Sequence, residues 1–95
     1  MILRWTEQAA SDLEEIHDHI ALNHPDNALA WVKTLQARAR DAAALPFAGR
    51  EVPERRGQGI REVIEGNYRI AYRVLPEGGI EVLTVFEGHR LPRSI

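Results

Sequence analysis

The alternation of apolar and polar positions between residues 60 and 90 predicts three short β-strands. The strands cover residues 60–64, 68–75 and 80–86, and the segments between them contain glycine, asparagine or proline, which favour turns. Strands joined by such short turns pair in an antiparallel sheet. The last run is apolar on both faces, so we expect it to be the most deeply buried strand.

The middle strand divides its side chains between two chemically different faces, because successive side chains of a strand point to opposite sides of the sheet. One face carries Arg69 and Arg73, and we expect the preceding strand to add Arg61 to it. The other face is apolar and aromatic and carries Tyr68, Ile70, Tyr72 and Val74. The pattern therefore predicts a covered apolar face and an open face with three arginines.

Two amphipathic helices precede these strands and can cover the apolar face. Apolar residues recur with helical spacing over residues 7–22 and 25–44. Thr6 is a suitable N-cap for the first helix, and Pro25 suits the first turn of the second. A short link between such helices gives an antiparallel hairpin. A short N-terminal strand is expected at residues 2–5, so the order of elements along the chain is β-α-α-β-β-β. This order predicts an α+β fold of two layers, with the helical hairpin packed on a small antiparallel sheet.

The segment 46–59 connects the hairpin to the strands and contains three glycines, two prolines and three arginines. We interpret it as a long surface loop, which is either functional or a mobile connector. The acidic group Asp12, Glu14 and Glu15 is interpreted as a solvated helix face. Aromatic side chains at Trp31, Tyr68 and Tyr72 are assigned to the core.

Composition limits the class of protein. The chain of 95 residues suffices for one domain, residues 1–95, and its 44% apolar and 27% charged residues are typical of a globular protein. It has no cysteine, so disulfides and thiolate metal sites are excluded. No apolar run reaches the length of a membrane span, and no signal peptide is visible. We expect a cytoplasmic protein that does not bind the membrane.

Charge is unevenly distributed along the chain. The net charge is −2, which argues against binding nucleic acid through bulk electrostatics. The acidic excess lies in residues 1–45, and residues 46–95 carry eight arginines against seven acids. Eleven of the twelve cationic side chains are arginine, whose planar guanidinium suits carboxylates and phosphates. A genome rich in G and C would also produce this bias.

The candidate site is basic and lies on the predicted sheet. Its residues are Arg61, Arg69, Arg73, His89 and Arg90, the last two just beyond the third strand. Arginine could hold a phosphate and histidine could act as acid or base, which together would cut RNA. The same arginines could instead bind carboxylates of a protein partner. They could also be solvated side chains paired with Glu62, Glu81 or Glu87. No metal site, nucleotide-binding loop or cofactor is expected.

The chain resembles the RelE/ParE superfamily of toxins from bacterial type II toxin–antitoxin modules, and its ParE-like branch in particular. The resemblance extends over nearly the whole chain, and the ordered set of motifs is more specific than any one of them. The matching positions are Ala10–Ile16, Leu45–Pro46, Gly49–Arg50, Ile60–Glu62, Asn67–Arg73 and Val82–Arg90.

The resemblance implies a growth-inhibiting toxin, of the kind that also stabilises plasmids, in a hetero-oligomer with a small antitoxin whose C-terminal segment wraps around it. In the RelE-like branch, basic residues of the sheet and a C-terminal Tyr or His cut mRNA on the ribosome. The ParE-like branch lacks that set and inhibits DNA gyrase. Arg69 matches a phosphate-binding arginine and His89 a catalytic histidine of nuclease members, but Arg90 stands where many have tyrosine. The resemblance therefore favours a non-enzymatic gyrase inhibitor, with ribosome-dependent mRNA cleavage as the alternative.

Overall fold

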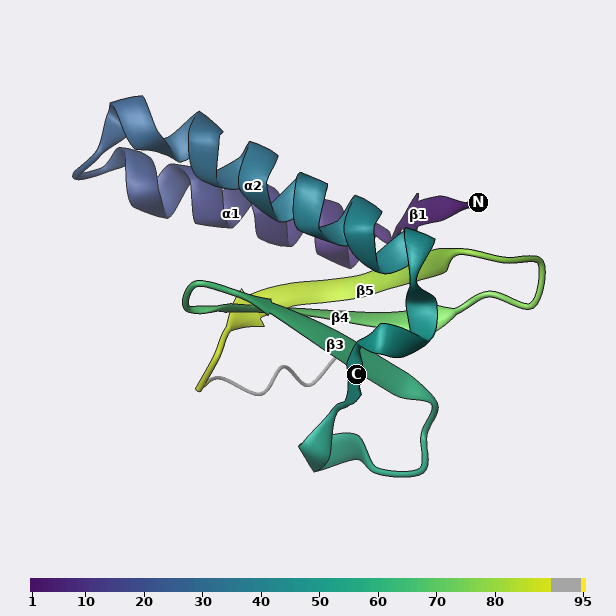
Figure 1. Cartoon of the computed structure of the whole chain (residues 1–95). Coiled ribbons are helices and arrows are strands. Elements are labelled where there is room, and N and C mark those ends of the chain that lie inside the picture. Colours follow the sequence, from purple (N-terminus) through teal and green to yellow (C-terminus); the bar gives the residue numbers. More distant parts are fainter. Residues whose placement is uncertain (90–94) are drawn as a thin grey trace.

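A helical hairpin lies across one face of a five-stranded sheet in the computed structural model, which describes residues 1–89 and 95 (Figure 1). The helices are α1 (Glu7–Ala21) and α2 (Pro25–Ala44). The strands are β1 (Leu3–Trp5), β2 (Arg50–Glu51), β3 (Ile60–Glu65), β4 (Tyr68–Val74) and β5 (Ile80–Glu87), in the spatial order β1-β5-β4-β3-β2. β1 is parallel to β5 and the other pairs are antiparallel, so the predicted α+β fold is confirmed.

The first helix begins where the sequence predicted, because Thr6 caps it. The Thr6 hydroxyl oxygen accepts a hydrogen bond from the Ala9 amide at 3.0 Å and donates one to the Leu83 carbonyl at 2.8 Å. This side chain therefore satisfies a free helix amide and also fixes α1 to the sheet. In α2, Pro25 occupies the first turn as expected, and the helix ends one residue before Leu45-Pro46.

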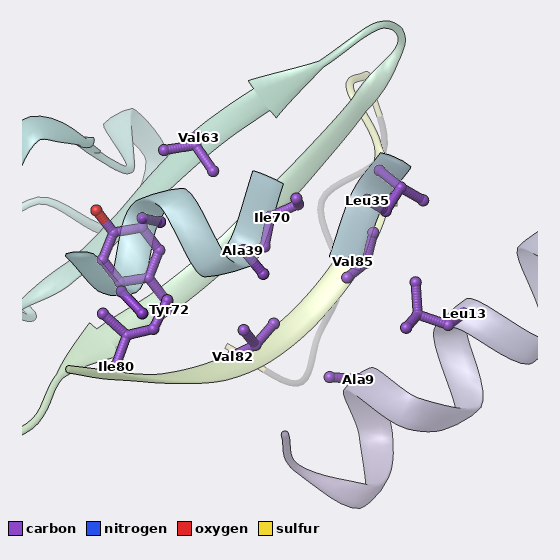
Figure 2. Packing of buried hydrophobic residues seen from close by; sticks show 12 residues of the cluster. Ala9, Leu13, Leu35, Ala39, Val63, Ile70, Tyr72, Ile80, Val82 and Val85 are labelled. Carbon is purple, nitrogen blue, oxygen red and sulfur yellow. The ribbon is translucent and has the colours of Figure 1, made fainter. Parts of the chain in front are cut away.

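The main core lies between the hairpin and the sheet (Figure 2). Small alanines on the buried side of α2 let the helix approach the strands closely, and Leu35 fills the space between them. Tyr72 is fully buried, and its hydroxyl donates a hydrogen bond to the Pro46 carbonyl at 2.6 Å. The other buried members are Ala9, Leu13, Ala39, Ala42, Ala43, Val63, Ile70, Ile80, Val82 and Val85.

A β-bulge in β5 changes which side chains face the helices. Tyr72 pairs with Val82 but Ala71 pairs with Thr84, so Leu83 is the extra residue. An extra residue reverses the alternation of faces beyond it. Val85 consequently packs under the helices, whereas Phe86 packs on the opposite face. Strict alternation would place Phe86 on the same face as Ile80 and Val82, and the bulge places it on the opposite face.

The face of the sheet away from the helices is covered, not open. A second apolar cluster of Val52, Ile60, Ala71 and Phe86 forms there, with Leu83 and Ile95 packed against it. Segment 46–59 folds around the end of the sheet to reach this face (Figure 1). It contains the short 3₁₀ turns η1 (Pro46–Ala48) and η2 (Pro53–Arg55) as well as β2. Most residues of the segment are exposed, as expected of a surface loop, but the buried Val52 anchors it against the sheet, so the prediction of an open arginine face is wrong.

No helix in the described part of the chain is long and apolar enough to cross a membrane.

The edge of β5 beyond β1 is closed by a side chain of α1. β1 pairs only with Ile80–Val82, so the later residues of β5 lie at the edge of the sheet. One Asp12 carboxylate oxygen accepts hydrogen bonds from the Val85 amide, at 3.0 Å, and from the Thr84 hydroxyl. The interpretation of Asp12 as part of a solvated helix face is therefore wrong. Its carboxylate occupies the backbone donor that a further strand would use.

Replacing Asp12 by alanine should lower the free energy of unfolding by about 1–3 kcal/mol, because a buried amide and hydroxyl lose their acceptor. Glu14→Ala removes an exposed carboxylate two residues away and should change it by less than about 0.5 kcal/mol. Urea denaturation measures both values. Equal effects of the two substitutions would contradict the role given to Asp12.

Candidate functional site

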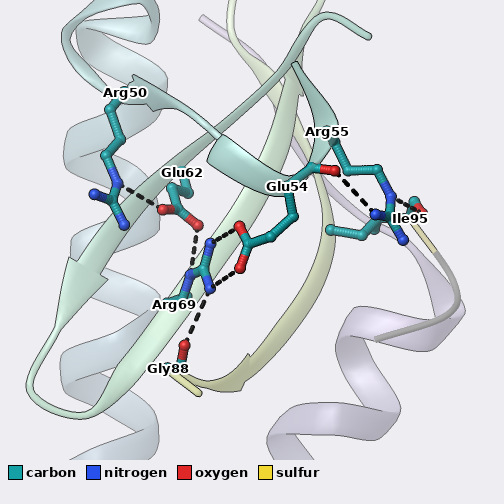
Figure 3. Close-up of polar contacts among 7 residues, drawn as sticks. All are labelled: Arg50, Glu54, Arg55, Glu62, Arg69, Gly88 and Ile95. Atoms are coloured by element: carbon teal, nitrogen blue, oxygen red, sulfur yellow. Dashed lines mark hydrogen bonds and ion pairs between the residues drawn. The ribbon is translucent and has the colours of Figure 1, made fainter. Parts of the chain in front are cut away.

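Arg69 lies near the start of β4, on the face opposite the helices, and is almost completely buried. Only 6% of the residue is exposed. Its Nε donates to Glu62 Oε1 at 2.7 Å, and its two terminal nitrogens donate to the two Glu54 oxygens at 2.9 and 2.7 Å (Figure 3). Nη1 also donates to the Gly88 carbonyl at 3.0 Å. The guanidinium is thus held by two carboxylates and one main-chain oxygen, and the Glu54 pair is bidentate.

Glu62 connects this arginine to a second one. Its carboxylate is fully buried, and its other oxygen accepts a hydrogen bond from Arg50 Nε at 2.6 Å. The ring of Phe86 lies beneath the Arg69 guanidinium, with 5.0 Å between the ring centroid and Cζ. We call Arg50, Glu54, Glu62 and Arg69 the Arg69 network. Its charges compensate each other, which is the condition for burying ionised groups.

The network also fixes the charge of its members. Hydrogen bonds from Arg69 lower the pKa of Glu54 from an ordinary 4.5 to about 2, and those from Glu54 raise the pKa of Arg69. Glu54 therefore stays ionised at neutral pH. Because its pKa is lower in the folded protein, it contributes stability above about pH 4.5, and that stability is lost as the pH falls toward 2.

The other two sheet arginines do not join Arg69 on one surface. Arg61 pairs across the strands with the buried Tyr72, so it lies on the helix side. Its Nη1 donates to the Gly49 carbonyl at 2.7 Å. Arg73 does lie on the same face as Arg69, but it is exposed and donates to the Gln58 carbonyl at 2.7 Å. The expectation that all three arginines share one open face is therefore wrong.

His89 is placed at the rim of a shallow hollow on the outer face. Its side chain is 81% exposed, and Nε2 lies 3.2 Å from a Glu87 carboxylate oxygen. The hollow is also lined by Arg50 and Arg69. The structure therefore brings the predicted site residues Arg69 and His89 near each other, together with Arg50, which was not predicted. Arg90 lies outside the described residues.

The sequence pattern identified one acidic partner of Arg69 and missed the other. Glu62 is one of the three glutamates that the sequence offers as partners, and it lies on the neighbouring strand. Glu54 comes from η2, fifteen positions away along the chain, and no periodicity indicates that this turn folds under the sheet. The sequence does contain one signal for this fold of the segment. Val52, two residues before Glu54, is an apolar residue in a largely polar stretch, and it is buried in the structure.

A second candidate surface is a trough between α1 and the edge of β5. It consists of two adjoining hollows of about 500 and 260 Å³ that share His19 and Tyr68. We call it the α1 trough. Its rim carries the carboxylates of Asp12, Glu15 and Glu87. Apolar residues line it at Ile16, Ile20, Trp31, Tyr68 and Val85.

Neither surface offers a metal-binding cluster. Across residues 1–89 and 95, no three His, Asp or Glu side chains are grouped to hold an ion.

Comparison with known proteins identifies the class. A helical hairpin on this sheet is the architecture of the toxins of type II toxin–antitoxin systems. The chain aligns with the "Chromosomal ParDE TA system from P. aeruginosa" at a TM-score of 0.76 and 26% identity. The alignment covers 92% of this chain and 95% of that one. Residues 3–92 match the family described as "ParE toxin of type II toxin-antitoxin system, parDE". The chain therefore belongs to the ParE toxin family.

A more distant structure shares the fold alone. The toxin–antitoxin complex RelBE2 from Mycobacterium tuberculosis aligns at a TM-score of 0.55 and 22% identity, over 90% of this chain and 94% of that one. A search of curated protein sequences finds no significant match.

Replacing Arg69 by alanine should lower the free energy of unfolding by about 3–5 kcal/mol, because it leaves the buried Glu62 and the partner Glu54 without their shared cation. Arg73→Ala, on the same face but exposed, should change it by less than about 0.5 kcal/mol. Thermal and urea denaturation measure both. A stable Arg69→Ala variant would show that this arginine does not serve the fold and is available for a ligand.

Proposed function

We propose that this toxin inhibits DNA gyrase and is neutralised by a cognate antitoxin in the cytoplasm. The observation that carries the proposal is the engagement of Arg69, together with the ParE family membership of the chain. A nuclease of the RelE type needs this arginine to hold a phosphate. Here two carboxylates already hold it.

The energetics of Arg69 favour a structural role over phosphate binding. All three guanidinium nitrogens donate hydrogen bonds within the protein. To bind a phosphate, the side chain would have to leave Glu54 and Glu62, and the buried Glu62 would lose one of its two arginine partners. Breaking a buried ion pair costs several kcal/mol. The net charge of −2 also gives no electrostatic attraction toward the ribosome.

The remaining acid/base candidate is poorly equipped for cleavage. His89 is paired with Glu87 and is highly exposed, so no protein environment excludes water from it. Of the other predicted residues, Arg61 lies on the opposite face and Arg73 bonds the Gln58 carbonyl. These positions support target binding without catalysis, and mRNA cleavage remains the alternative that the experiment must exclude.

The α1 trough supports the antitoxin part of the proposal. The two structural relatives described above, a ParDE system and the RelBE2 complex, are toxin–antitoxin systems. A groove with an apolar floor and three carboxylates at its rim suits a partner segment that carries both apolar and basic side chains. We propose that the C-terminal segment of the antitoxin occupies it, which makes the working assembly a hetero-oligomer.

Two assays on the purified toxin test the function. We expect it to block supercoiling by gyrase and to leave mRNA intact in a translating extract, and the antitoxin should restore supercoiling. Cleavage of mRNA with unaffected supercoiling would instead establish the nuclease alternative, and His89→Ala would then test the residue assigned to acid/base chemistry.

A charge reversal tests the trough within the same assay. Glu15→Arg at the rim should weaken neutralisation by the antitoxin, whereas Glu14→Arg, which does not line the trough, should leave it unchanged. Neither variant should alter inhibition by the toxin alone.

A further inference from the structure

The free edge of β5 forms one wall of the α1 trough. Four consecutive residues of this strand, Thr84 to Glu87, line the larger hollow. Successive side chains of a strand point to opposite faces, and Val85 and Phe86 indeed pack in the two different apolar clusters. Residues of both orientations meet in one hollow only along the edge of the strand, where the main-chain groups lie. The hollow therefore lies beside the backbone of β5.

Two main-chain groups at this edge are open to a partner. The Val85 amide points away from β4, because it donates to Asp12 of α1, whereas the Gly88 amide donates to the Asn67 carbonyl at the start of β4. In an antiparallel ladder the side to which a residue points its amide and carbonyl alternates along the strand. The Val85 carbonyl and the Glu87 amide therefore also point to the free edge, and neither forms a hydrogen bond within residues 1–89 and 95.

Unpaired groups at a sheet edge can pair with an added strand. The open groups favour a segment that runs parallel to β5, as β1 already does. In a parallel pair, one residue bonds the carbonyl before its neighbour and the amide after it. A residue beside Phe86 would thus bond the Val85 carbonyl and the Glu87 amide. An antiparallel segment that covers both residues would also need the Val85 amide, which Asp12 occupies.

The trough has the length of a short strand. α1 runs along β5, and its residues from Gln8 to His19 line the larger hollow (Figure 1). With a rise of about 1.5 Å per helical residue, this part of α1 spans about 16 Å. An extended chain rises about 3.3 Å per residue, so about five residues fit along the trough.

The two sides of the added segment would meet different surroundings. Val85 pairs with Ile70 and Glu87 with Tyr68, so both β5 side chains lie on the helix side of the sheet. In the added segment, the residues before and after the one beside Phe86 point to that side as well. The first lies beside Val85, where an apolar side chain fits. The second lies beside the carboxylate of Glu87, where a lysine or arginine fits.

The lining of the larger hollow is acidic. It carries the carboxylates of Asp12, Glu15 and Glu87, and among the described residues its basic side chain is His19. The Asp12 oxygens already accept hydrogen bonds from the chain itself. Glu15 forms no ion pair within residues 1–89 and 95, and Glu87 pairs with the exposed His89. Both arginines of the Arg69 network bind the carboxylates of that network. A cation from a partner is therefore complementary to this hollow.

We propose that the antitoxin binds the α1 trough as a short added strand, parallel to β5, with the local pattern apolar residue, any residue, lysine or arginine. This inference rests on the proposed function and specifies how the antitoxin segment is held. The middle residue pairs through its main chain with Val85 and Glu87. The apolar residue lies beside Val85 and the cation beside Glu87. Asp12 keeps the Val85 amide and so marks where the added ladder begins.

Hydrogen exchange at single amides tests the pairing, measured by NMR on the free toxin and on its complex with the antitoxin. The Glu87 amide should exchange at least about tenfold more slowly in the complex, because a bonded amide exchanges only when the structure opens. The Val85 amide is the internal reference and should be protected in both states, since Asp12 already accepts from it. An unprotected Glu87 amide in a complex that forms normally would overturn the inference.

Two substitutions at one position separate the main chain from the charge. Glu87→Gln removes the carboxylate and keeps the amide, whereas Glu87→Pro removes both. The sheet tolerates proline here, because this amide faces the edge and not β4. The dissociation constant of the antitoxin should rise about threefold for Glu87→Gln and about tenfold further for Glu87→Pro. Equal affinities of the two variants would show that the amide is not used. Melting temperatures check that both variants fold, and the exchange measurement on the wild type stands independently of them.

The remaining outcomes separate this inference from the proposed function. If Glu15→Arg weakens antitoxin binding but the Glu87 amide stays unprotected, the antitoxin occupies the trough in another form, and only the added strand is refuted. If the Glu87 amide becomes protected in the free toxin as its concentration rises, the edge pairs with a second copy of this chain, and the inference is wrong. If the antitoxin binds Glu15→Arg normally and leaves Glu87 unprotected, the trough is not its site, and both proposals for the trough fail.

Discussion

The buried guanidinium of Arg69 is the constraint on which the outer half of the structure depends. A charged group in this position must have anionic partners, and β4 and its neighbours supply only Glu62. The second partner, Glu54, reaches it only if segment 46–59 turns under the sheet. That path buries Val52 against Phe86 and Ile60. One ion network therefore positions the cover of the outer face, and this cover replaces the open sheet that strand periodicity alone suggests.

The sequence was sufficient for features that local chemistry determines. The spacing of apolar residues gave both helices and three strands, Thr6 gave the first helix cap, and Tyr72 was correctly assigned to the core. Features that depend on distant contacts were missed. The extra residue at Leu83 breaks the strict alternation of faces, and a pattern of period two cannot reveal it. The partnership of Glu54 with Arg69 and the role of Asp12 at the sheet edge likewise depend on the folded arrangement.

The same arginine links the fold to the question of mechanism. A guanidinium cannot at once neutralise two carboxylates of its own chain and stabilise the charge of a reacting phosphate. In this ParE-family toxin the first use is observed, which argues against the nuclease alternative. One surface left for a partner is the α1 trough. It offers an apolar floor with carboxylates beside it, which suits the binding of a peptide segment.

The most direct test of this account is a double-mutant cycle between Arg69 and Glu54, measured by urea denaturation of the wild type, Arg69→Met, Glu54→Gln and the double variant. At pH 7 we predict a coupling free energy of at least about 1 kcal/mol, as for residues that share an ion pair. The coupling should decline as the pH falls toward 2, because Glu54 then becomes protonated. Additive effects at pH 7, with no coupling, would contradict the claim that Arg69 is held for the fold.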